Sequence, residues 1–94
     1  MEEFKKIITL PTQDDKGINF LWDGGEAISV SVERNNNNEV LIKANKAGLV
    51  TLARHLLTLA EDSIEDRSHL HLDPETGVNA ESAPLILEKD INLI

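Results

Sequence analysis

Alternation of apolar and polar positions in the first half of the chain predicts a series of strands. Residues 4–10 are β-prone up to Pro11, and apolar side chains then recur at every second position over residues 18–22. Two adjacent glycines at 24 and 25 predict a tight hairpin turn. Residues 28–33 have the cleanest alternation, with one buried and one solvated face. Asn35 to Asn38 then predict a hairpin connection to a strand over residues 40–44.

After Asn45, the spacing of apolar residues changes from every second position to the period of a helix. Asn45 is a favourable N-cap, and the new spacing predicts one amphipathic helix over about residues 46–62. On a helical wheel the apolar residues occupy one half: Leu49, Leu52, Ala53, Leu56, Leu57, Leu59, Ala60 and Ile64. The other half is polar: Thr51, Arg54, His55, Thr58, Glu61 and Asp62. We therefore expect the apolar half to pack on a sheet and His55, at the edge of the polar half, to lie in solvent or at a flank.

Alternation returns in the last third of the chain. Leu70 and Leu72 share one face of a predicted strand over residues 68–73, and a turn follows at residues 73–77. The connection to Pro84 is long for a compact domain, so we expect it to be mobile or functional. A last strand is predicted from residue 85 to 89. The whole pattern predicts a single α+β domain over residues 1–94, with an antiparallel sheet of about five to six strands, the helix on one face and the other face open.

Charge limits the classes of partner. The net charge of −8 disfavours nucleic acid, which needs a basic face, and anionic membrane surfaces, and it favours a basic partner. The chain has no cysteine, which excludes disulfides and thiolate metal sites. Its first residues are acidic where a signal peptide is basic, and no stretch approaches a membrane span. We therefore expect a cytoplasmic protein.

The candidate chemistry is confined to one strand. His69, His71 and Asp73, at i, i+2 and i+4, project from the same side, a spacing that can place two imidazoles and a carboxylate around one metal. The same spacing also fits a polar outer face or a partner contact, so three interpretations stay open. No Gly-x-Ser-x-Gly elbow, phosphate loop or buried carboxylate pair is evident. We expect no enzymatic activity and no cofactor.

Residues 45–73 carry a family resemblance. The sequence Asn-Lys-Ala-Gly-Leu at 45–49 leads into Leu-Ala-Arg-His-Leu-Leu-Thr-Leu-Ala at 52–60, a spacer follows, and His-Leu-His-Leu-Asp stands at 69–73. With Leu-Ile-Leu-Glu at 85–88, this pattern resembles the immunity protein 32 family, small bacterial proteins that neutralise polymorphic toxins. The resemblance implies tight binding to a cognate toxin and supplies no catalytic residues. The first forty residues and the loop at 74–84 match nothing in the pattern.

Toxin binding is therefore our leading interpretation, with a basic toxin as the partner and the chain a monomer or weak homodimer. The predicted contacts are the open sheet face and the nearby acidic loop: Ser29, Ser31, Glu33, His69, His71, Asp73, Glu75 and Glu81. Two alternatives remain. One is a metal-binding protein or metal-dependent enzyme that uses His69, His71 and Asp73, and the other is a structural or regulatory domain that pairs through a sheet edge.

Overall fold

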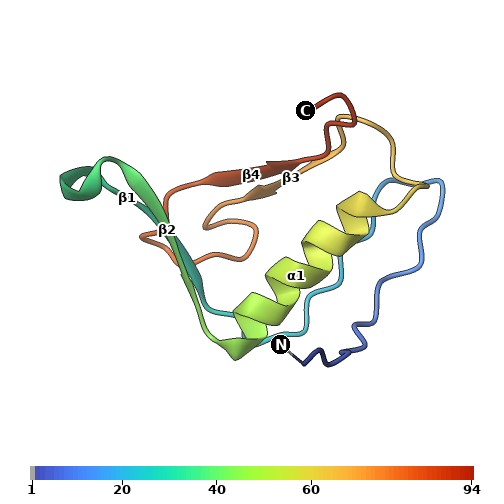
Figure 1. Ribbon diagram of the computed structural model, residues 1–94, viewed down its shortest axis with the longest axis horizontal. Helices are drawn as coiled ribbons and strands as arrows, with labels where there is room; N and C mark the ends of the chain where they lie inside the picture. Colours follow the sequence, from blue (N-terminus) through green and yellow to red (C-terminus); the bar gives the residue numbers. More distant parts are fainter. Residues whose placement is uncertain (1) are drawn as a thin grey trace.

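The structure, a computed structural model, describes residues 2–94 and has the α+β composition that the sequence predicts (Figure 1). Its elements in chain order are β1 (Ile28–Glu33), a 3-10 turn (Arg34–Asn36), β2 (Glu39–Ala44), α1 (Lys46–Ala60), β3 (His69–Leu72) and β4 (Leu85–Glu88). The prediction of one helix after Asn45 is confirmed, although α1 ends at Ala60 rather than near residue 62.

The prediction of a single sheet with five to six strands is wrong. The strands form two separate antiparallel pairs, β1–β2 and β3–β4. Residues 4–10 and 18–22 form no strand and instead run as irregular chain along α1. Side chains rather than a backbone ladder fix this segment: Gln13 both donates to the Asn19 carbonyl oxygen and accepts from the Asn19 N–H, at 2.9 and 2.8 Å.

The connection between β3 and β4 holds the two strand pairs together. The N–H of Asn79 donates to the Ile28 carbonyl oxygen at 2.8 Å, and the N–H of Ala83 donates to that of Val30 at 2.7 Å. The Ser82 hydroxyl accepts from the Val30 N–H at 2.8 Å. Residues 79–83 therefore occupy the edge of β1 and anchor the second half of the loop, which the sequence predicted to be mobile or functional.

The apolar core lies where β1, β3 and this connection meet. Ile28, Leu72 and Val78 are its buried centre. Half-buried side chains pack against it: Trp22, Ala44, Leu52, Leu70, Leu85 and Leu87. The backbone of Gly77 packs closely against the Trp22 ring: a Cβ added at Gly77 would lie 2.6 Å from that ring. The φ of Gly77 is +132°, so only glycine fits at this position.

Helix α1 is oriented differently from the prediction. Its buried residues include Thr51, Arg54, His55 and Thr58, four members of the half that the wheel assigned to solvent. Leu49, Leu56 and Leu57, on the apolar half, are exposed. In Figure 1 the helix lies between the β3–β4 pair and the blue N-terminal segment. That segment covers the polar half of α1, so only the apolar flank around Leu52 and Leu59 is left to meet the strands.

Candidate partner-binding site

The predicted contact residues on β1 share one face, as expected. Ser29, Ser31 and Glu33 alternate with Ile28 and Val30, which are buried. The Ser31 hydroxyl donates to a Glu33 carboxylate oxygen at 3.1 Å. On this face Ser29 and Glu33 lie opposite Lys43 and Glu39, and Ser31 lies opposite the apolar Leu41. The two serines and Glu33 are half-buried.

The two histidines of the predicted site also share a face. His69 and His71 are exposed on β3, and their rings meet edge to face with centroids 5.0 Å apart. Asp73 serves a different purpose: one carboxylate oxygen accepts from the N–H groups of Glu75 and Thr76 at 3.0 and 3.1 Å, which fixes the turn after β3. Within residues 2–94, no group of three or more His, Asp or Glu side chains is placed to hold a metal ion.

The predicted open face is divided. Ser29, Ser31 and Glu33 belong to the β1–β2 pair, whereas His69 and His71 belong to β3–β4, which hydrogen-bonds in a separate sheet. Glu75 and Glu81 are exposed in the connection at residues 73–84. The structure thus brings the predicted residues to two surfaces rather than one, and their contact with a partner stays a prediction.

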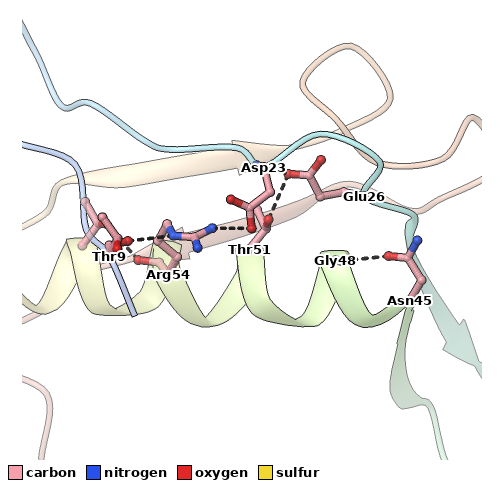
Figure 2. A network of polar contacts seen from close by, with 8 residues as sticks. Thr9, Asp23, Glu26, Asn45, Gly48, Thr51 and Arg54 are labelled. Carbon is pink, nitrogen blue, oxygen red and sulfur yellow. Dashed lines mark hydrogen bonds and ion pairs between the residues drawn. The ribbon is translucent and has the colours of Figure 1, made fainter. Parts of the chain in front are cut away.

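A polar network that the sequence analysis missed joins α1 to the N-terminal segment (Figure 2). The Arg54 guanidinium donates through Nε to the Thr9 carbonyl oxygen at 2.8 Å and through an Nη to the Asp23 carboxylate at 2.9 Å. The Thr51 hydroxyl donates to the Glu26 carboxylate at 2.9 Å. Burial alone would raise the pKa of Glu26, but hydrogen bonds from its own N–H, from Thr51 and from the Asp23 and Gly24 N–H groups outweigh that and lower it.

His55 lies beside this network and is fully buried, whereas the sequence predicted that it would lie in solvent or at a flank of the helix. Its ring packs edge-on against Phe20 and Trp22, with centroids 5.2 and 4.6 Å apart. Neither ring nitrogen has a hydrogen-bond partner. Burial lowers the pKa of His55, the neighbouring Arg54 charge lowers it further, and Glu26 acts in the opposite direction.

Asn45 fixes the start of α1 against both neighbouring elements. Its side-chain oxygen accepts from the Gly48 N–H at 2.8 Å, as the predicted N-cap should, and also from the Ala27 N–H at 3.0 Å. Its amide nitrogen donates to the Gly25 carbonyl oxygen at 3.0 Å. The cap therefore also positions the Gly24-Gly25 turn, which enters β1.

An apolar groove between α1 and β4 is the second feature that the sequence analysis missed. It has a volume of about 350 Å³, and its lining is Leu56, Leu59, Ala60, Ile86, Leu87, Glu88 and Lys89. Leu56 and Ile86 are 53% and 55% exposed, which is high for large aliphatic side chains. Leu56, Leu59 and Ala60 belong to the apolar half of the predicted helix, but periodicity did not indicate that the strands would leave part of that half uncovered.

In a comparison with known protein families, the model of immunity protein 32 matches residues 39–90, more than half of the chain. The chain belongs to the immunity protein 32 family. The resemblance suggested by the sequence is thereby confirmed. The matched region contains β2, α1, β3 and β4, and it leaves out β1 and the segment that covers the polar half of α1.

The family identifies the chain as an immunity protein, and membership implies binding to a cognate toxin. No curated protein and no solved structure shows a significant match. In the part of the chain that the structure describes, no helix is long and apolar enough to cross a membrane.

Proposed function

We propose that this immunity protein neutralises one cognate bacterial toxin by stoichiometric binding in the cytoplasm, as a single domain and without catalysis. The observation that carries the proposal is the immunity protein 32 match over residues 39–90. Binding by mass action alone would suffice for such a role, because a tight complex holds its partner inactive for as long as it persists.

The charge of the chain supports a basic partner. A net charge of −8 on 94 residues attracts cationic surfaces and accelerates encounter with them at low ionic strength. The same charge opposes binding to nucleic acid and to anionic membranes and weakens any homodimer.

The test is protection from the toxin encoded beside the gene. Cells that express this toxin should survive only when the immunity protein is co-expressed, and killing despite soluble immunity protein would refute the proposal for that pair. Titration of the purified toxin separates binding from catalysis. Stoichiometric binding predicts that residual toxin activity falls linearly and reaches its floor at one equivalent, whereas an enzyme would inactivate the toxin progressively at a small fraction of one equivalent.

Ionic strength tests the basic character of the partner. If electrostatic attraction steers the encounter, the association rate constant should fall by tenfold or more between low and high salt while the dissociation rate constant changes less. An association rate that is independent of salt would contradict a basic toxin surface. Paired alanine substitutions at His69 and His71, and at Ser29 and Ser31, then test the predicted contacts on the two sheet faces.

A further inference from the structure

The groove between α1 and β4 lies beside an unpaired strand edge. Strand β4 pairs with β3 alone in the described residues, in the register Leu70 with Leu87 and Leu72 with Leu85. Just beyond β4, the Lys89 N–H donates to the Ser68 carbonyl oxygen at 2.9 Å. Hydrogen bonding alternates along an antiparallel strand, so Leu87 and Leu85 also point their backbone groups towards β3. The N–H and C=O groups of Ile86 and Glu88 therefore point away from it.

The side chains beside this edge are apolar. Leu56, Leu59 and Ala60 form the helical wall of the groove, and Ile86 and Leu87 form the strand wall. A strand added to β4 would extend the sheet over the part of α1 that β3 and β4 leave uncovered. It would satisfy the outward backbone groups of β4 and cover the exposed side chain of Leu56 on the helix side of the sheet.

The end of the groove is acidic. Glu61, Asp62 and Glu65, which follow α1, are exposed and form no ion pair within residues 2–94. Two cations are nearby, but both are engaged: Arg67 pairs with Glu88 at 3.2 Å, and the Lys89 ammonium donates to the Glu61 and Ile64 carbonyl oxygens at 2.7 and 2.8 Å.

We propose that the α1–β4 groove is the toxin-binding surface, and that an extended segment of the toxin pairs with the outer edge of β4, places an apolar side chain against Leu56 and sets a basic side chain beside Glu61 and Asp62. This inference rests on the proposed function. A second copy of the chain fits less well, because it would bring another net charge of −8 and a second acidic groove end.

The test uses two matched helix variants and a catalytically inactive form of the toxin encoded by the adjacent gene. Leu56→Lys places a cation where the proposal seats an apolar side chain of the toxin, so binding would have to desolvate an unpaired charge. Leu57→Lys is the control, because Leu57 is similarly exposed at 45% and does not line the groove. We expect the Kd measured by calorimetry to rise at least tenfold for Leu56→Lys and less than threefold for Leu57→Lys. Circular dichroism and thermal melting verify that each variant is folded.

Amide hydrogen exchange of the wild-type protein measures directly whether a strand is added to β4. In the complex, the outward N–H groups of Ile86 and Glu88 should become at least tenfold more protected than in the free chain. A complex in which both exchange as in the free chain, or in which Leu56→Lys binds as tightly as wild type, would overturn the groove proposal and leave toxin binding standing. Failure of the wild type to bind would overturn both. A wild-type dimer that Leu56→Lys converts to a monomer would assign the groove to self-association instead.

Discussion

His55 should destabilise the protein in a way that can be measured, because it is fully buried with neither ring nitrogen hydrogen-bonded. A buried polar group without a partner costs about 1–3 kcal/mol. His55→Phe removes that cost while keeping an aromatic ring against Phe20 and Trp22. Repacking around a ring of slightly different shape costs up to about 1.5 kcal/mol. The net expectation is a gain of about 1 kcal/mol in the free energy of unfolding, the difference between the middle values of these two ranges.

The pH dependence carries a second part of the same prediction. Burial places the folded-state pKa of His55 below its ordinary value of 6.5, so below pH 6.5 the unfolded chain binds more protons than the folded one. The free energy of unfolding is therefore unaffected by His55 protonation above pH 6.5. It decreases as the pH falls from 6.5 through the folded-state pKa, because protonation then favours the unfolded chain. Glu26, whose pKa is also lowered, contributes its own loss only below about pH 4.5, in a separate window.

Urea denaturation of wild type and His55→Phe at pH 8 and pH 5 measures both effects. The variant should be more stable at pH 8 and lose less stability at pH 5. His55→Leu guards against overpacking by the larger ring, and His71→Leu, which removes an exposed histidine, should retain the acid-induced loss of the wild type. If both His55 variants are less stable than wild type at pH 8, the ring nitrogens are satisfied in solution and the reasoning is wrong. An unchanged loss between pH 6.5 and 5 would assign the proton to another group.

Three further predictions concern contacts of α1. Asn45→Ala removes the cap and its bonds to Ala27 and Gly25, and should lower the free energy of unfolding by about 1–2 kcal/mol in denaturant titrations. Gly48→Ala should destabilise by about 1–3 kcal/mol despite the better helix propensity of alanine, because the new Cβ would lie 2.7 Å from the Ala27 carbonyl oxygen; a gain in stability would contradict that close packing. Arg54→Met should cost about 1.5–3 kcal/mol and accelerate proteolysis of the N-terminal segment, and cleavage at the wild-type rate would show that Arg54 does not hold it.

Several local elements could be predicted because their signals lie within a few residues. The alternation around Val30, the asparagine loop and the Asn45 cap all specify conformation through neighbouring atoms, and β1, β2 and the start of α1 are where these signals place them. The β-prone run at residues 4–10 was misleading, because strand propensity does not decide what a segment packs against, and this segment lies along α1, where the Thr9 carbonyl oxygen accepts from Arg54.

The candidate site was less accessible from the sequence. Five of the predicted contact residues lie on strands with the expected facing: Ser29, Ser31, Glu33, His69 and His71. The sheet that was to unite them is two separate pairs. The groove between α1 and β4 depends on which half of the helix contacts the strands. Periodicity identifies the apolar half of the helix, but it does not identify the elements that cover that half.

The sequence alone determined the acidic charge, the helix with its cap, the β1–β2 hairpin and the family of immunity proteins, because each follows from composition or from residues close together in the chain. Only the tertiary structure decided that Thr51, Arg54 and His55 face inwards while Leu49 and Leu56 face out. The physical reason is the N-terminal segment: Thr9, Asp23 and Glu26 supply hydrogen-bond partners to the polar half of α1 from at least 25 residues away in the chain, and this pairing leaves the apolar half beside an open strand edge.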